Sequence, residues 1–411
     1  MTTTGALGES AALHEYRLAA RAWITAHLTP YDGEDPDLVE PRTPQRVAES
    51  RRIQAALHEA GYAGFTFLVE DGGQGLTPDH ERIFLEEAAG FDVPTRLFGV
   101  SINVLGAALA AFGTPEQKAA HLPRILSGQE LWLQLLSEPG GGSDLAGLLM
   151  SARREGDHYV VNGQKTWSSG AHLADFALCP VRTAWDVPKH RGISVLIVDL
   201  RSPGIEIRPM RQLNGEVHFC EEFFTDVEVP AAHLVGDEHD GWRVVRGLLG
   251  IEHAWVGRGG PKRGDTLHDV GDVVALARRR GLIGDPAVRG EIAGLYVAMR
   301  VQQALTERVP AAIAAGHLDP GYGSLLKIGR DELLQRAAVV ALAIAGAEGV
   351  AWDPTIAGGD RWSGTVLSSR SASISGGTVE IQRNNVGERV LGLPREPTTD
   401  RELPFNQVPH N

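Results

Sequence analysis

The chain has 411 residues, which exceeds the usual size of one domain, so we expect two or three packed units. Hydrophobic residues make up 43% and charged residues 22%, a globular composition that excludes a disordered or fibrous chain. The formal net charge of -13 disfavours nucleic-acid binding, which needs clustered Lys and Arg.

Leader and membrane signals are weak. The chain begins MTTTGALGES, with neither a basic nor an apolar leader region, so we expect a cytoplasmic protein. The longest apolar stretch, residues 337–347, is too short for a membrane span and predicts a buried helix. Cys179 and Cys220 lie outside any CxxC pair, which predicts isolated thiols.

The order of elements is helical, then β, then helical. Apolar residues recur at helical spacing at 13–28, 45–60, 79–89, 101–112 and 115–126. From residue 130, runs rich in Val, Ile and Phe alternate with turn residues and predict strands, with Asn162-Gly163 interpreted as a hairpin turn. Helical patterns return at 242–256, 266–280, 287–315, 323–350 and 380–391. This order predicts a ligand crevice where helices meet a small sheet.

The segment SEPGGGSD, residues 137–144, is the most informative motif. Its glycines let backbone approach a ligand closely, and its serines supply directional hydrogen bonds. It fits neither a P-loop nor a dinucleotide-binding GxGxxG turn. Taken alone, its composition favours a plain surface turn over a ligand-binding loop.

Several segments in order resemble the acyl-CoA dehydrogenase family. SEPGGGSDLAG is similar to the family's first signature, and HYVVNGQKTWSSGAHLADF to the strands that follow it. RGISVLIVDL, VHFCEEFFTDVEVP, GW, IEH and SGGTVEIQRNNVGERVLGLPRE then occur in the family's order. The resemblance implies an α+β fold with an N-terminal helical domain at 1–129, a small β-barrel or sheet domain at 130–240, a four-helix bundle at 241–396 and a tail at 397–411.

By the same resemblance, FAD lies between the β domain and the bundle. The implied flavin-lining residues are Leu135, Ser137, Gly142 and Ser143 on one side, Trp167 and Ser169 on the other, and Thr378 and Glu380 in the late segment. An indole against the flavin ring would exclude water. The alternative for Trp167 is an aromatic core residue of a strand.

Arg280 belongs to an Arg-x-x-Ile-Gly element that resembles the family's Arg-x-x-Phe-Gly contact with the FAD pyrophosphate of a neighbouring subunit. The alternative is a charged helix C-terminus. The family's Gln-x-x-Gly-Gly element is weakened here to residues 343–347, AIAGA.

The catalytic base is displaced relative to many family members. Gly376 stands where they carry the catalytic carboxylate, and it cannot abstract a proton. Other branches use an earlier helix, and LGIEH offers Glu252 there as general base. The alternative for Glu252 is a solvated helix carboxylate. His253 replaces the usual Arg, and its role stays open.

The implied reaction is α,β-dehydrogenation of an acyl-CoA to the trans-2-enoyl-CoA. Glu252 would remove the α proton while the β hydride passes to flavin N5. The backbone N–H of Gly376 and a flavin ribityl hydroxyl would polarise the thioester carbonyl. The residues expected to contact the substrate are Ser143, His253 and Gly376.

The resemblance also implies partners. Electrons would pass to an electron-transfer flavoprotein, and the assembly would be a homotetramer or dimer, with a heteromer possible. Fatty acyl, branched, aromatic or steroid side-chain thioesters are all compatible. We expect no metal site, because His218 and Cys220 lie in no metal-ligand motif. Two alternatives stay open: a flavin monooxygenase or oxidase on the same fold, and an FAD-poor non-catalytic subunit of a heteromeric dehydrogenase.

Overall fold

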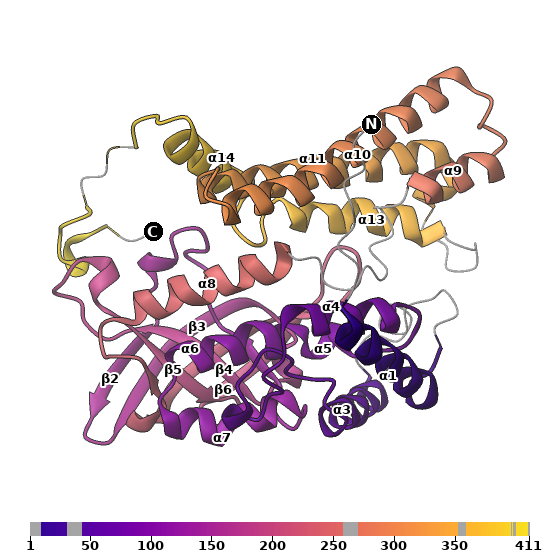
Figure 1. The fold of residues 1–411 in the computed structure, drawn as a ribbon. Helices are drawn as coiled ribbons and strands as arrows, with labels where there is room; N and C mark the ends of the chain where they lie inside the picture. The colour runs from indigo at the N-terminus through magenta and orange to yellow at the C-terminus, as the bar shows by residue number, and fades with distance from the viewer. Residues whose placement is uncertain are drawn as a thin grey trace. The chain divides into compact units, whose positions relative to one another are not determined.

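A computed structural model describes residues 10–30, 43–257, 270–351, 359–395, 397 and 400–409. The chain forms two compact units. Unit 1 comprises Met1–Arg211, Val217–Gly264 and Thr399–Asn411, and unit 2 comprises Gln212–Glu216 and Asp265–Thr398. The order of helical, β and helical segments gives the predicted α+β fold (Figure 1).

The N-terminal helices of unit 1 begin at the polar caps that their sequences offer. Their bounds are α1 Ala11–His27, α3 Pro44–Glu59, α4 Pro78–Glu87, α5 Thr95–Val100, α6 Ala107–Phe112 and α7 Pro115–Leu126. Thr43 and Thr114 accept backbone N–H groups at the starts of α3 and α7, each followed by proline at the first helical position. A π-helix, Ser101–Gly106, joins α5 to α6.

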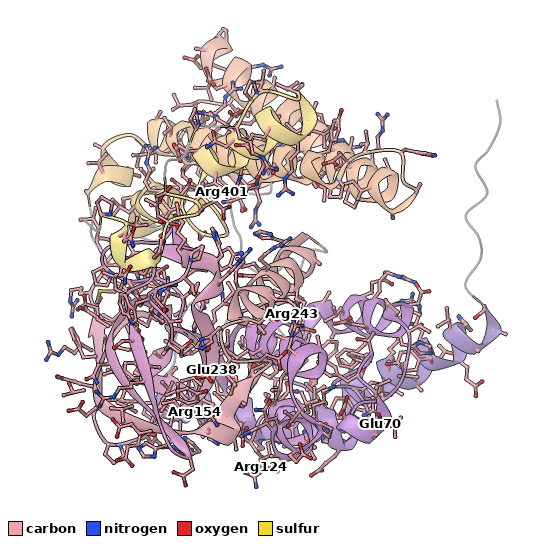
Figure 2. All side chains as sticks on the ribbon, turned by 90° about the vertical axis from the view of Figure 1, so that its left-hand side faces the viewer. Glu70, Arg124, Arg154, Glu238, Arg243 and Arg401 are labelled. Carbon is pink, nitrogen blue, oxygen red and sulfur yellow. The ribbon has the colours of Figure 1, made fainter. Side chains whose placement is uncertain are left out.

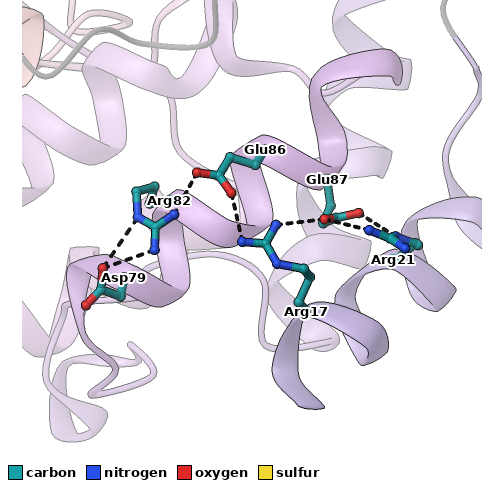
Figure 3. Close-up of polar contacts among 6 residues, drawn as sticks. All are labelled: Arg17, Arg21, Asp79, Arg82, Glu86 and Glu87. Carbon is teal, nitrogen blue, oxygen red and sulfur yellow. Dashed lines mark hydrogen bonds and ion pairs between the residues drawn. The ribbon is translucent and has the colours of Figure 1, made fainter. Parts of the chain in front are cut away.

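A ladder of ion pairs joins α1 to α4 (Figure 3). Arg17 donates to Glu86 at 2.9 Å and to Glu87 at 2.8 Å, and Arg21 donates to Glu87 at 2.6 Å. Arg82 extends the ladder to Glu86. Much of this ladder is exposed, so the buried apolar core that α1, α3 and α4 share holds these helices together more strongly.

The strands of unit 1 form one eight-stranded sheet in the order β6-β7-β3-β2-β4-β5-β8, with β1 paired to β4. The strands are β1 Trp132–Gln134, β2 Ser151–Glu155, β3 His158–Ser169, β4 Phe176–Arg182, β5 Ile193–Asp199, β6 Ile205–Met210, β7 Phe219–Pro230 and β8 Leu234–Val235. An ion pair between Arg154 of β2 and Glu238, at 3.3 Å, links the sheet to the loop that leads into the next helix (Figure 2).

The central strands are buried on both faces, which explains their continuous apolar runs. Leu178, Val195 and Ile197 face a core shared with α7 and the π-helix. Their neighbours in the chain, including Cys179 and Leu196, face a second core within the sheet. Cys220 lies in that second core with its Sγ 3.2 Å from Nδ1 of His172, and both cysteines are thiols outside any disulfide, as predicted.

The predicted turn at Asn162-Gly163 is wrong. Strand β3 runs straight through both residues, and the hairpin from β2 turns at residues 156–157 instead. Gly163 has φ 143°, and a Cβ there would lie 2.9 Å from the Cα of Met150. The glycine therefore serves a β-bulge opposite β7 and a close backbone approach, which are also common uses of glycine in strands.

Helix α8, Gly241–Gly257, belongs to unit 1. Its residues Val244, Val245 and Leu248 are buried in the core that the π-helix also lines. A Cβ at Gly247 would lie 2.2 Å from the ring of Phe112, so the absence of a side chain allows α8 to approach α6 closely.

The described residues of unit 2 from 270 onward are mostly helical. Its helices are α9 Val270–Arg279, α10 Pro286–Ala314, α11 Gly323–Ala345, α12 Ala347–Val350, α13 Gly359–Ala372 and α14 Val379–Asn385, with a π-helical turn at Val386–Val390. Residues of α9, α10, α11 and α13 share one apolar core. Within the described ranges, no helix combines the length and apolarity that a membrane crossing requires.

One helical prediction in unit 2 needs correction, and one helix was not predicted. The predicted helix at 323–350 breaks at Gly346, where φ 63° and ψ -141° lie outside the helical region. Helix α13 was missed, because its Ser- and Gly-rich sequence has low helix propensity. Burial of Trp362, which is 3% exposed, shows that tertiary packing stabilises this helix.

Candidate active site

The glycine-rich segment 137–144 follows β1, and one of its own residues, Glu138, anchors it to neighbouring parts of the chain. The carboxylate of Glu138 accepts the backbone N–H groups of Leu149 at 2.6 Å and Met150 at 3.0 Å. It also pairs at 2.9 Å with Nζ of Lys165, whose side chain is fully buried. The loop is therefore a built structure with a charged anchor, which is more than a plain surface turn requires.

The predicted flavin-lining residues of this segment differ in exposure. Leu135 is fully buried, and its N–H donates to the carbonyl of Leu178 at 3.0 Å, extending the pairing of β1 with β4. Ser137 is half-buried, whereas Gly142 and Ser143 are exposed. A Cβ at Gly142 would lie 3.7 Å from Oγ of Ser137, so the loop folds back over its own beginning.

Trp167 stands out from β3 at a second bulge. Its φ is 65°, a left-handed conformation that costs a non-glycine residue roughly 1–3 kcal/mol. Its side chain is 60% exposed and meets the Phe219 ring edge-on, at a centroid distance of 5.8 Å. This exposure contradicts the alternative of a buried core aromatic. Strained backbone that presents an indole to solvent is typical of a ligand-contacting position.

The structure brings the loop and the bulge together. The N–H of Thr166, the residue before Trp167, donates to the carbonyl of Ser137 at 2.9 Å. Ser169, on the other side of the bulge, is exposed like Trp167. The two segments that the resemblance assigned to opposite sides of the flavin are therefore neighbours joined by a direct hydrogen bond.

Glu222 lies beneath the bulge and was missed in the sequence. It is fully buried on β7, and Oγ of Ser168 donates to its Oε2 at 3.0 Å. Within the described ranges, its Oε1 has no hydrogen-bond partner. Burial raises the pKa of Glu222 to about 7. The alternation of β7 was the available signal, because it places Cys220, Glu222 and Phe224 on the buried face.

Glu252, the predicted base, is half-buried on α8. Nε2 of Gln134 donates to its Oε2 at 3.2 Å. Gln134 ends β1 and immediately precedes Leu135, so this contact connects Glu252 to the strand that leads into the glycine-rich loop. Sequence reasoning missed Gln134, although a polar residue in the run WLQLL was a signal. His253 is exposed.

The remaining predicted site residues lie in unit 2. Arg280 directly follows α9, which ends at Arg279, and pairs with Glu348 at 2.5 Å. A Cβ at Gly346 would lie 3.6 Å from Nη2 of Arg280, so the two weakened adenine-side elements meet within this unit. The guanidinium of Arg280 therefore has a carboxylate partner within its own unit. This ion pair is compatible with the alternative interpretation of Arg280 as a charged residue at a helix C-terminus.

The late segment forms the start of α14. Oγ1 of Thr378 accepts the N–H of Ile381 at 3.2 Å and so caps the helix. The carbonyl of Gly376 accepts Nε2 of Gln382 at 3.2 Å, and Glu380 is exposed in the first helical turn. The helix cap thus gives Thr378 a structural role besides its predicted one.

The residues of unit 1 suit the flavin that the resemblance implies. An exposed indole at a strained bulge supplies an apolar stacking surface, and the adjoining Ser137, Ser143 and Ser169 supply hydrogen-bonding hydroxyls. Among the described residues, no three His, Cys, Asp or Glu side chains are grouped to hold a metal ion.

Three family models match successive parts of the chain. They are described as the acyl-CoA dehydrogenase N-terminal domain at residues 10–129, middle domain at 134–227 and C-terminal domain at 239–391. The chain is 35% identical over 390 residues to acyl-CoA dehydrogenase IpdE1 of Mycobacterium tuberculosis, covering 93% of this chain and 98% of the relative.

Two solved structures have the same fold. A protein described as the Tcur3481-Tcur3483 steroid ACAD matches with TM-score 0.76 and 29% identity, over 95% of this chain and 100% of the other. The ChsE4-ChsE5 complex of Mycobacterium tuberculosis matches with TM-score 0.70 and 28% identity, over 95% of this chain and 100% of the other.

Proposed function

Because the chain belongs to the acyl-CoA dehydrogenase family, we propose that it oxidises the α and β carbons of an acyl-CoA with Glu252 as base and FAD as acceptor. Membership makes the chain an oxidoreductase acting on acyl-CoA. The observation that carries the finer proposal is the placement of Glu252, half-buried and hydrogen-bonded to Gln134 at the strand that leads into the glycine-rich loop.

Glu252 takes the α proton of the thioester. An acyl-CoA α proton is only weakly acidic, so a carboxylate must be held in a fixed orientation against it. The hydrogen bond from Gln134 to Oε2 restricts the rotation of this carboxylate. We further propose that the backbone N–H of Gly376 polarises the thioester carbonyl, and that Ser143 and His253 contact the substrate.

Nine residues that the family resemblance assigns to FAD would hold the cofactor. They are Leu135, Ser137, Gly142, Ser143, Trp167, Ser169, Thr378 and Glu380, together with Arg280, which would contact the FAD pyrophosphate of a neighbouring subunit. Bound FAD would supply the acceptor for the β hydride. Trp167 shields this acceptor from water, while the serine hydroxyls orient its polar edge. An electron-transfer flavoprotein would then remove the electrons.

The names of two related structures sharpen the substrate and assembly proposals. One is described as a steroid ACAD, and the other as a complex of two named proteins. We therefore propose a steroid side-chain or similarly bulky thioester as substrate, and an assembly of two or more subunits that is homomeric or heteromeric. The division at residues 1–129, 130–240, 241–396 and 397–411 remains our proposal for its domains.

A titration tests the reaction, and one substitution tests the base. Anaerobic addition of fatty acyl, branched and steroid side-chain thioesters should bleach the flavin absorbance with one class only. Glu252→Gln should keep FAD and thioester binding but lose about 10²–10⁴ in turnover, the usual contribution of a general base. Glu59→Gln, an exposed change on α3, is the matched control. Full turnover in Glu252→Gln would show that another group is the base.

A further inference from the structure

The C-terminal segment 400–409 packs on the loop that follows β4. The N–H of Phe405 donates to the carbonyl of Val187, and that of Asn406 to the carbonyl of Trp185, both at 2.8 Å. A β-bridge pairs Pro404 with Pro188. Phe405 is only 1% exposed, so the segment inserts an aromatic side chain into unit 1.

Phe405 covers a buried cation. The guanidinium carbon of Arg182 lies 3.8 Å from the centre of the Phe405 ring, and Arg182 is fully buried. Burial lowers the pKa of Arg182 to about 10, so the side chain stays charged at neutral pH. A desolvated cation over an aromatic face is among the stronger arrangements of this kind.

Arg182 in turn holds the backbone just after the glycine-rich loop. Its Nη2 donates to the carbonyls of Ala146 at 2.6 Å and Leu148 at 3.2 Å, and its Nη1 to the carbonyl of Lys189 at 2.6 Å. Ala146 lies two residues after the end of segment 137–144. The ring of Phe405 and the loop carbonyls therefore surround the same cation.

A second contact connects the same two segments. Nζ of Lys189 lies 3.0 Å from a carboxylate oxygen of Asp144 and 3.8 Å from one of Asp400. Asp144 ends the glycine-rich loop, and Asp400 begins the C-terminal segment. Lys189 thus bridges the loop and the segment at a point separate from the ring of Phe405.

We propose that segment 400–409 is a clamp that positions the glycine-rich loop, with Phe405 and Arg182 as its positioning residues. The ring of Phe405 fixes the guanidinium, and the guanidinium fixes the carbonyls at 146 and 148. Loss of the ring loosens the backbone that Glu138 also anchors at Leu149 and Met150. The effect on ligand binding rests on the proposed function, whereas the clamp itself does not.

Hydrogen exchange of the FAD-loaded enzyme tests the clamp without any substrate. Phe405→Leu keeps most of the buried volume but removes the ring, and should speed exchange of the amides at 145–150 about tenfold. Phe405→Tyr retains the ring and should exchange like the unmodified chain. Leu403→Ala changes an apolar residue of the same segment, 40% exposed, and is the matched control.

Two outcomes of this experiment would overturn the clamp. One is unchanged exchange at 145–150 in Phe405→Leu while residues 400–409 exchange faster. The other is an equal rise in α3, at 44–59, which would show general destabilisation. The rate of FAD release from the loaded enzyme, followed by flavin fluorescence, separates the two proposals. Faster exchange at 145–150 with unaltered FAD release supports the clamp and contradicts a flavin-binding role for the loop.

Discussion

Two acidic residues lie beneath the candidate site in contrasting surroundings. Glu138, under the glycine-rich loop, has a buried lysine and two backbone amides as partners. Glu222, under the Trp167 bulge, has one serine hydroxyl, and within the described ranges its second oxygen has no partner. The comparison teaches that depth alone does not set the role of a carboxyl group. Its partners decide whether it is a charged anchor or a group that takes up a proton.

Removing the partner of Glu138 should have the largest effect on stability. Lys165→Met leaves a buried carboxylate without its cation, which should lower the free energy of unfolding by about 3–5 kcal/mol. Urea denaturation measures the change. Lys189→Met is the control, because its partners Asp144 and Asp400 are 61% and 30% exposed and the loss should stay under about 1 kcal/mol. If both substitutions lowered the free energy of unfolding equally, the buried Lys165–Glu138 pair would be no more stabilising than the exposed Lys189–Asp144 pair.

Glu222 should make stability depend on pH. Its pKa is raised from 4.5 to about 7 in the folded chain, so its contribution is fully present below about pH 4.5 and is lost as pH rises through about 7. The amide of Glu222→Gln does not titrate, so the variant does not lose this stability as pH rises. Between pH 5 and 8 the variant should therefore gain on the unmodified chain by up to roughly 3 kcal/mol. A constant difference across this range, measured by urea denaturation, would contradict a raised pKa.

The smallest of these effects should come from Ser168, which donates a hydrogen bond to Glu222. Ser168→Ala removes its hydrogen bond, which should cost about 1–2 kcal/mol and raise the pKa of Glu222 further. The pH window of Glu222 should then move upward in the same denaturation series. Ser169→Ala, at the exposed neighbouring position, should leave both the stability and the window unchanged.

Local sequence patterns predicted most of the helices described above. Helical periodicity located α1, α3, α7 and α10 closely, because amphipathic helices record their buried face in the sequence. Helix α13 was missed, because the packing of Trp362 in the core outweighs the low helix propensity of its neighbours. The turn expected at Asn162-Gly163 failed, because the same dipeptide also serves a bulge where another strand comes close.

For the candidate site, the sequence indicated some residues and missed others. Residue types and family resemblance pointed to Trp167 and Glu252. The sequence did not reveal the strained backbone of Trp167 or the hydrogen bond between Gln134 and Glu252. Gln134 and Glu222 were missed, because their significance lies in contacts across the sheet and with α8. Such partners are far apart in the chain, and a single sequence carries no direct record of them.

The burial of both cysteines has a practical consequence for labelling. Cys179 and Cys220 are enclosed in the core of the sheet, and burial raises the pKa of the Cys179 thiol to about 12. A thiol that stays protonated and enclosed reacts slowly with maleimides or other alkylating reagents. One cysteine introduced on the surface could therefore carry a fluorophore or spin label in the folded protein, with both native cysteines left in place.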